Sequence, residues 1–263
     1  MQLSTNHFAH ACLAGMLAAV LVGCATTETP TVVDTAANEA AIRAAVDNPE
    51  RTTKDREKDA DRRPFDVLKF AGVAPGQKVI DIFSAGGWYA ELLARTVGPT
   101  GQVYMQNPSN ARMAEKAAAE RLADNRLPNV VRWDKLLNEL ALPPAYFDGA
   151  MLNLVYHDFY TLSDDVDDVL TDLYAGLKPG AWVVVVDHSA PAGTGKSFAT
   201  DPRGAHRIDE TFVKESFAKA GFVLEAESDL LRNPDDDRQK AFFAPEMKGK
   251  ATDKFILRFR KPR

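Results

Sequence analysis

Residues 153–160 combine side chains that could position and deprotonate a reactant. His157 has an ordinary pKa of about 6.5 and could therefore act as a general base near neutral pH. Tyr156 precedes it and Asn153 begins the segment, so a hydroxyl and an amide are available to orient a ligand. We predict that Tyr156 and His157 are catalytic. The alternative for His157 is a hydrogen-bonded structural histidine.

Two further histidines, His188 and His206, are predicted near the same edge of the fold, next to Asp187 and Arg207 respectively. Three histidines could ligate a transition metal, but their spacing matches no compact metal-binding motif. We therefore predict no metal site. The acidic residues 164–168 follow Ser163 at a predicted helix N-terminus, where the helix dipole favours negative charge.

A run of small residues, Ser84-Ala85-Gly86-Gly87, lies between Asp81 and Trp88. Small residues let the backbone approach a ligand closely, and the N-terminus of the following helix presents unpaired N–H groups. The run therefore indicates a ligand-binding loop. The alternative for this run is a tight turn that needs glycine only for its own geometry. The alternative for Trp88 is a place in the core.

Strand-like and helix-like segments alternate along the chain, which predicts a mostly parallel sheet with helices on both faces. The segment 230–250 has no clear helix and predicts an antiparallel pair at one edge. We expect strands at 78–83, 102–105, 130–133, 147–154, 181–187, 222–227 and 253–260, and helices at 38–46, 65–70, 88–97, 109–125, 163–177 and 210–220. Residues 51–63, with six basic and four acidic side chains, predict a solvated helix, and residues 193–197 predict a flexible lid.

Four landmarks occur in order along the chain, at residues 74–81, 101–104, 147–150 and 177–181. They resemble the first motif, the second strand, the entry to the fourth strand and the turn before the fifth strand of class I S-adenosylmethionine-dependent methyltransferases. The resemblance covers about residues 62–262. It implies an α/β fold with a Rossmann-like, seven-stranded sheet, mostly parallel with an antiparallel edge strand. More narrowly, the chain is similar to a group of bacterial predicted methyltransferases, many with lipoprotein signals.

The resemblance also implies S-adenosylmethionine as the cofactor. The residues expected to bind it are Asp81, Ser84, Ala85, Gly86, Gly87, Trp88, Asn107, Asp134 and Asn153. Asp81 would act on its amino-acid end through water or hold the loop, and Asp134 would meet the adenine amino group or cap a helix. Asn153 and Tyr156 take the first and last places of an Asn-Pro-Pro-Tyr box that lacks its prolines.

Two departures from the family pattern concern the nucleoside. Its three alternating glycines are here Phe83, Ala85 and Gly87, so we expect the loop to take another path around the bulky Phe83. Asn107 stands where the family has an acid that accepts hydrogen bonds from both ribose hydroxyls. An amide in place of this acid lacks the charge-assisted part of the hydrogen bonds to the ribose. Its loss would cost on the order of 1 kcal/mol, which is roughly tenfold in affinity for the cofactor.

The N-terminus resembles that of a bacterial lipoprotein. Residues 11–22 are an apolar run too short to span a bilayer, and Leu21-Val22-Gly23-Cys24 resembles a lipobox with Cys24 as the lipid-modified residue. No Lys or Arg precedes the run, so the positively charged N-terminal region that is typical of signal peptides is weak. We expect a signal peptide at 1–23, a tether and short helix at 24–50 and the methyltransferase-like domain at 51–263, anchored in the cell envelope and facing the periplasm.

The composition excludes several function classes. The 263 residues carry a net charge of −5, which disfavours broad binding to nucleic acid. Beyond Cys12 and Cys24 there is no cysteine, so the body has no thiolate chemistry. We expect methyl transfer to a small or lipidic acceptor. The alternative is an inactive, ligand-binding lipoprotein. A nicotinamide oxidoreductase fits less well, because the loop lacks the dinucleotide-binding spacing.

Overall fold

The computed structural model describes residues 1–2, 35–163, 165–201 and 204–263. Cys24 and all of the predicted signal peptide except residues 1–2 lie outside these ranges. From residue 35 onward the chain forms one compact body. That body includes α1 (Thr35–Val46), the helix that the sequence analysis grouped with the tether, because its buried Ile42 and Ala45 pack against α4 (Pro64–Ala71) and α5 (Trp88–Val97).

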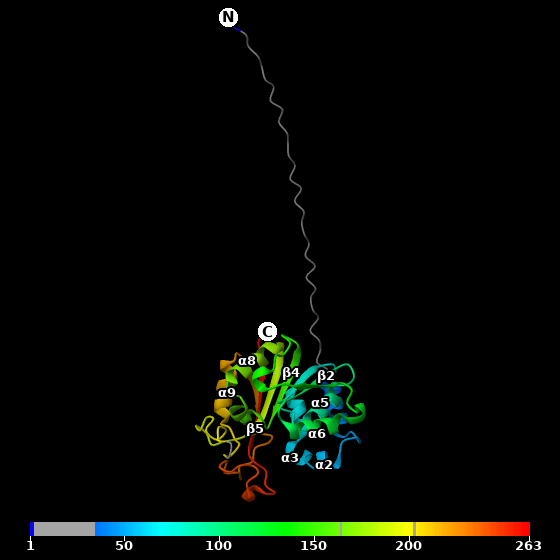
Figure 1. Ribbon diagram of the computed structural model, residues 1–263, viewed down its shortest axis with the longest axis vertical. Coiled ribbons are helices and arrows are strands. Elements are labelled where there is room, and N and C mark those ends of the chain that lie inside the picture. Colours follow the sequence, from blue (N-terminus) through cyan, green and yellow to red (C-terminus); the bar gives the residue numbers. More distant parts are fainter. Residues whose placement is uncertain (3–34, 164, 202–203) are drawn as a thin grey trace. The chain divides into compact units, whose positions relative to one another are not determined.

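A seven-stranded sheet forms the centre of the body (Figure 1). In spatial order it consists of β3 (Val130–Asp134), β2 (Gln102–Asn107), β1 (Lys78–Ile82), β4 (Phe147–Asn153), β5 (Leu177–His188), β7 (Lys254–Arg260) and β6 (Val223–Ser228). Neighbouring strands from β3 to β5 are parallel, and β7 is antiparallel to both β5 and β6. The prediction of a mostly parallel sheet with an antiparallel pair at one edge is confirmed.

Helices cover both faces of this sheet, as Figure 1 shows for α8 (Val166–Gly176) and α9 (Glu210–Lys219) on one side and α5 and α6 (Arg112–Leu122) on the other. Successive side chains of a strand point to opposite faces of the sheet, so each strand contributes to the hydrophobic core on both faces. In β5, Val183 and Val185 enter the core beneath α8 and α9, whereas Val184 and Val186 enter the core beneath α1, α4 and α5.

Helix starts differ from the sequence predictions by a few residues. The carboxylate of Asp165, rather than Ser163, caps α8 by accepting the N–H groups of Asp167 and Asp168. Ser109 does not cap α6, which begins at Arg112. The remaining short elements are η1 (Ala123–Asn125), η2 (Leu137–Glu139), η3 (Tyr156–Asp158), α7 (Phe159–Leu162) and η4 (Pro245–Met247).

The predicted solvated helix at residues 51–63 is wrong. Two four-residue helices, α2 (Thr53–Arg56) and α3 (Asp59–Arg62), replace it. Arg51 and Asp55 are buried there, because Arg51 pairs with Asp59 at 2.7 Å and Asp55 pairs with Arg121 at 2.9 Å. These ion pairs fold the segment back over the carboxyl ends of the strands, at the same end of the body as the segment after β6 (Figure 1).

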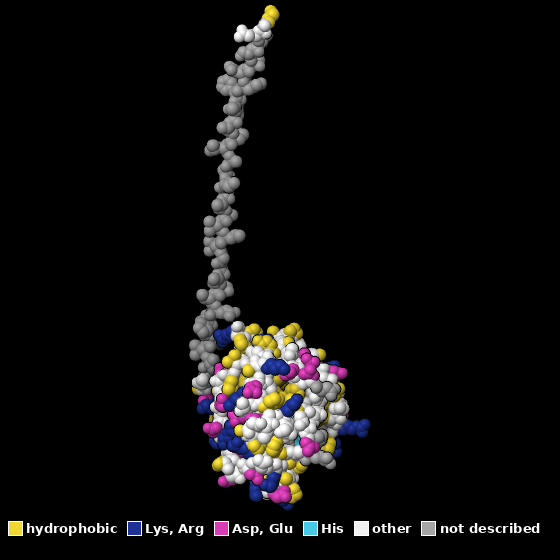
Figure 2. Space-filling model, turned by 90° about the vertical axis from the view of Figure 1, so that its left-hand side faces the viewer, with side chains coloured by type: hydrophobic (Ala, Val, Ile, Leu, Met, Phe, Trp, Pro, Cys, Tyr) yellow, Lys and Arg dark blue, Asp and Glu magenta, His cyan; other side chains and the backbone are white. Residues whose placement is uncertain are grey.

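The surface matches the mixed charge of the sequence. On the face shown in Figure 2, acidic, basic and hydrophobic side chains are interspersed. Within the described ranges, no helix combines the length and the hydrophobicity that a membrane crossing requires.

Gly149 provides a test of the sheet. It lies beside Trp182 in the register of β4 and β5, and a Cβ atom there would come within 2.1 Å of the indole. Overpacking of this kind costs about 1–3 kcal/mol, so Gly149→Ala should lower the free energy of unfolding by that amount in urea denaturation. Adding Trp182→Val should recover part of the loss, and an unchanged stability of Gly149→Ala alone would contradict the packing described.

Candidate functional site

A cavity of about 460 Å³ opens at the carboxyl ends of β1 and β4. The order of the strands reverses at this point, and ligands of open α/β sheets bind at such a crevice. Its volume falls within the range of small-molecule sites. Six of the residues predicted to bind cofactor line it: Asp81, Ser84, Ala85, Gly86, Trp88 and Asn153.

The loop after β1 has an unusual backbone. Its φ angles are 49° at Phe83, 50° at Ala85 and 75° at Gly87. These are the three positions that the sequence analysis matched to the alternating glycines of the methyltransferase motif. The backbone adopts the left-handed conformation that glycine favours at all three positions, although glycine remains at one, so Phe83 and Ala85 adopt this strained conformation themselves.

Gln106 holds this strained loop from the neighbouring strand. Its side-chain carbonyl accepts the N–H of Phe83 at 2.8 Å, and its backbone carbonyl accepts the N–H of Ser84 at 2.9 Å. Gln106 is fully buried, and its amide donates in turn to the carbonyl of Lys135 at 2.7 Å. The left-handed residues are thus held by buried hydrogen bonds, which a mobile side chain could not provide.

Asp81 lies at the base of the cavity and is almost completely buried. Burial raises its pKa to about 7, although the hydroxyl of Ser84 and the N–H of Ala90 donate to it. A carboxyl group with this pKa is protonated in about half of the molecules at neutral pH. A cationic ligand would favour its ionised form.

Trp88 and Tyr89 form the wall between the loop and the short helices. The Trp88 indole donates to the carbonyl of Asp55 at 3.0 Å, and the Arg62 guanidinium lies 4.8 Å from its ring centre. The hydroxyl of Tyr89 is buried and has no hydrogen-bond partner in the described part of the chain. Because buried hydroxyls are normally paired, this group indicates a missing partner at the cavity wall.

Three predicted cofactor residues do not line the cavity. The Cα of Gly87 faces Met105 and Arg121, where a Cβ would come within 2.7 Å of the methionine. Asn107 donates its amide to the carbonyl of Ala85 at 3.0 Å, and its buried Oδ1 has no partner among the described residues. Asp134 pairs with Arg132 at 2.7 Å. Gly87 and Asn107 shape the loop, and Asp134 is not among the residues that line the cavity.

The two predicted catalytic residues lie behind the cavity wall. Tyr156 is fully buried, packs against Phe159 and Phe217, and has its hydroxyl 3.2 Å from that of Tyr160. It cannot touch a ligand in the cavity, so the structure contradicts its predicted role.

His157 is likewise buried, and its Nδ1 lies 2.7 Å from Oδ1 of Asp187. Burial alone would lower its pKa, but Asp187 and Asp158 outweigh that effect and raise the pKa to about 10. The imidazole is then protonated at neutral pH and lacks the lone pair of a general base. The prediction of His157 as the base is therefore wrong for this state, and the structural alternative fits.

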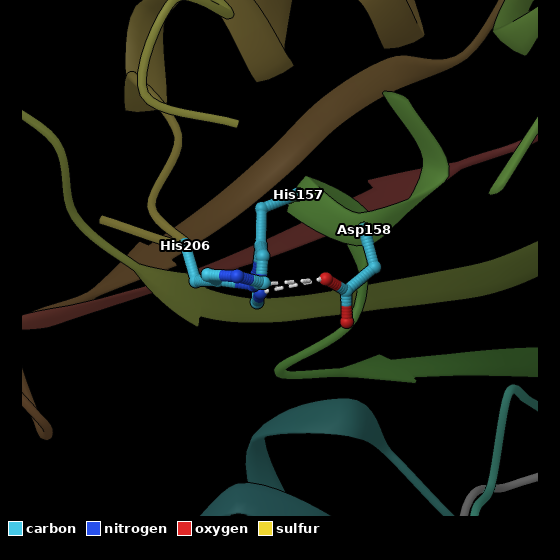
Figure 3. A group of neighbouring side chains, drawn as sticks. All are labelled: His157, Asp158 and His206. Atoms are coloured by element: carbon cyan, nitrogen blue, oxygen red, sulfur yellow. Dashed lines mark hydrogen bonds and ion pairs between the residues drawn. The ribbon is translucent and has the colours of Figure 1, made fainter. Parts of the chain in front are cut away.

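His157, Asp158 and His206 form one cluster, shown in Figure 3. Oδ1 of Asp158 lies 3.3 Å from Nε2 of His157 and 3.3 Å from Nδ1 of His206. Asp158 also lines the cavity. Burial would raise its pKa, but hydrogen bonds from the two histidines lower it.

His188 is the histidine that reaches the cavity, and the sequence analysis did not select it. Burial and neighbouring cations lower its pKa well below 6.5, so its imidazole is neutral. Its Nδ1 lies 2.6 Å from the hydroxyl of Thr252, and the ring of Phe242 stacks on it at 5.0 Å. Both partners come from the segment after β6, which sequence spacing alone did not connect to this edge.

That segment is fixed by a buried ion pair between Arg207 and Asp236, at 2.7 Å. Asp236 also accepts the N–H of Asp253, next to Thr252. The loop predicted as a lid is tied differently, because the N–H groups of Gly193 and Gly195 donate to Asp209. This loop does not line the cavity.

Comparison with known proteins places these observations in context. No family model matches the chain. It is 33% identical over 128 residues to a 2-phytyl-1,4-naphtoquinone methyltransferase of Synechococcus elongatus, which covers 48% of this chain and 52% of that protein. It is 29% identical over 153 residues to the ubiquinone/menaquinone biosynthesis C-methyltransferase UbiE of Serratia proteamaculans, covering 57% and 59%. The chain thus matches little more than half the length of these relatives.

A solved structure extends the comparison to the whole body. A SAM dependent methyltransferase from Aquifex aeolicus superposes with a TM-score of 0.59 and 19% identity, over 85% of this chain and 98% of that chain. The body has the class I methyltransferase fold. The loop after β1 therefore occupies the position of this fold's first motif, and the fold prediction is confirmed.

The left-handed loop residues of this methyltransferase fold yield a paired prediction. Ala85→Gly removes a backbone strain of about 1–2 kcal/mol and adds the chain entropy of glycine, so the free energy of unfolding should rise by about 0.5–1 kcal/mol. Gly87→Ala should lower it by about 2 kcal/mol or more, because φ is 75° and Met105 blocks the Cβ. Thermal and urea unfolding measure both. Equal effects of the two changes would contradict the described path.

Proposed function

We propose that this protein binds S-adenosylmethionine in the cavity next to the loop 81–88 and transfers its methyl group to a small or lipidic acceptor. The observation that carries the proposal is the left-handed backbone at Phe83, Ala85 and Gly87, in the first-motif position of the class I fold. The curated relatives, whose names describe quinone methyltransferases, support the same reaction class.

The residues of the cavity fit this cofactor in charge and size. S-adenosylmethionine carries a sulfonium and an amino-acid end with both charges. Asp81 offers a carboxylate to a cation, and Lys58 and Arg62 offer cations to a carboxylate. The unpaired hydroxyl of Tyr89 offers a further hydrogen bond. Asn107 is the exception, because its amide is engaged by the loop and it lies outside the lining.

The sulfonium supplies the reactive methyl group when the cofactor is bound, so the protein has to position the acceptor and accept a proton from it. The neutral His188 is the residue of this cavity best suited to accept a proton. Thr252 orients its ring through Nδ1, and Phe242 covers one face. His157, which is charged, instead fixes the end of β5 through Asp187.

The acceptor proposed is a flat or lipidic molecule such as a hydroxylated ring. Phe83, Leu154, Val155 and Phe242 give the cavity an apolar side, and the ring of Phe242 is about half exposed. Apolar surface next to a neutral imidazole suits a molecule with a ring and a hydroxyl group.

Anchoring in the cell envelope through Cys24 belongs to the same proposal. It rests on the apolar run and the lipobox-like residues of the sequence. Cys24→Ala in the full-length chain should move the protein from the membrane to the soluble fraction of a bacterial host, with loss of labelling by radioactive palmitate. Unchanged labelling would contradict the anchor, without bearing on the cofactor.

Calorimetry tests the cofactor. We expect micromolar binding of S-adenosylmethionine and S-adenosylhomocysteine. Asp81→Asn should weaken the former about tenfold or more, because a buried charge-assisted contact is lost. Asp134→Asn is the matched control, since Asp134 ends the outer strand β3 and lies outside the cavity, and should change nothing. No heat at millimolar ligand would refute the proposal. Tight binding of S-adenosylmethionine without methylation of any quinol would favour the alternative of an inactive, ligand-binding protein.

The raised pKa of Asp81 predicts a pH dependence. Its folded-state pKa of about 7 exceeds its unfolded value of 3.8, so the folded form binds the extra proton between these values and Asp81 opposes stability as pH rises through this window. A cationic ligand stabilises the carboxylate, so binding at pH 7 should release about half a proton per site. Calorimetry in buffers of different ionisation enthalpy measures this release. Asp81→Asn should abolish it, and an equal release in the variant would contradict the assignment.

A further inference from the structure

The cluster of His157, Asp158 and His206 has the geometry of a metal site. One ligand atom from each residue lies within 4.8 Å of the other two. Oδ1 of Asp158 is 3.3 Å from a ring nitrogen of each histidine. Two ligands that bind a tetrahedral zinc ion at about 2.0–2.1 Å lie about 3.3 Å apart, so both measured separations match an edge of that tetrahedron.

Asp187 supplies the outer contact that a metal-binding histidine requires. Its Oδ1 lies 2.7 Å from Nδ1 of His157, which leaves Nε2 directed at Asp158 (Figure 3). Asp187 is itself held by the backbone N–H groups of His157 and His188, each at 2.8 Å. Carboxylate–histidine pairs of this kind fix the ring orientation and raise the basicity of the ligating nitrogen.

The backbone of His206 adds an independent observation. Its φ is 51°, a left-handed conformation that residues other than glycine seldom adopt. This conformation brings Nδ1 of His206 toward Asp158 from a different segment of the chain. Strain that gathers polar side chains is typical of functional sites.

The negative charge around His157 also favours the binding of a cation. Asp158 and Asp187 place two carboxylates around His157, and both are buried or half-buried. A divalent cation would displace the proton from Nε2 of His157 and take over the balance of these two charges. The rings that pack against the two histidines of the cluster, His188 against His157 and Phe243 against His206, bring no carboxylate of their own.

We propose that His157, Asp158 and His206 bind a divalent transition-metal ion, with Zn²⁺ as the best match. Three protein ligands leave a fourth position, which is the arrangement of catalytic zinc sites, and Asp158 places that position next to the cavity. Its ligand there would be an oxygen donor, either water or a hydroxyl group of a bound molecule. The ion would lower the pKa of that oxygen. The site itself does not depend on methyl transfer.

Cobalt(II) is the direct probe, because it replaces zinc and absorbs visible light strongly when four-coordinate. Full-length protein treated with a chelator and then titrated with Co²⁺ should develop this absorption at one equivalent, and Zn²⁺ should abolish it. Zinc should also raise the midpoint of thermal unfolding. Absence of both effects at stoichiometric metal would overturn the proposal.

Variants locate the ion. Asp158→Asn, which is isosteric, and His206→Ala, at a partly exposed position, should each weaken Co²⁺ binding by on the order of a hundredfold. Asp187→Asn should weaken it by about 10–100-fold. The control is Asp134→Asn, at the end of the outer strand β3, and it should bind Co²⁺ as the natural chain does. Unchanged Co²⁺ spectra in folded Asp158→Asn and His206→Ala proteins, judged by circular dichroism, would place the metal elsewhere and overturn the assignment. Calorimetry with S-adenosylhomocysteine on the same variants separates this result from failure of the proposed function.

Discussion

The backbone path between β1 and α5 is the constraint on which the cavity depends. Two residues with side chains, Phe83 and Ala85, adopt a left-handed conformation there, each at a cost of about 1–2 kcal/mol. The hydrogen bonds that the N–H groups of Phe83 and Ser84 donate to the buried Gln106 offset this cost, since each is worth about 1 kcal/mol and more if broken. Arg121 adds a further restraint, because its guanidinium donates to the carbonyl of Gly86 and pairs with Glu91.

Ion pairs organise the rest of this edge. Glu91 is buried on α5 and accepts hydrogen bonds from Arg95, Arg121 and Arg126, so its pKa falls below the usual value despite its burial. Asp55 joins α2 to the same cluster through Arg121. Breaking a buried pair of this kind costs about 3–5 kcal/mol, because the remaining charge stays buried and unpaired. The short helices over the cavity are therefore attached by charge more than by apolar packing.

The sequence predicted the fold well because the evidence for it is local. Alternation of β-branched strands and amphipathic helices sets the sheet, and the buried run at residues 183–186 is correctly a central strand. The site was predicted less well because its geometry is not local. Tyr156 and His157 follow β4 as expected, but the chain turns at η3 and directs them into the core. His188 lines the cavity and is held by partners more than fifty residues away in the chain. A single sequence also gave no signal that Phe83 and Ala85 would adopt a left-handed conformation.

The central claim is that the loop between β1 and α5 binds the nucleoside of S-adenosylmethionine. A crystal structure of the protein grown with S-adenosylhomocysteine tests it most directly. The account predicts density for the ligand in the cavity between Ala85 and His188, with Phe83 and Ala85 at positive φ. Density elsewhere, or a loop that occupies the cavity with ordinary backbone angles, would contradict it.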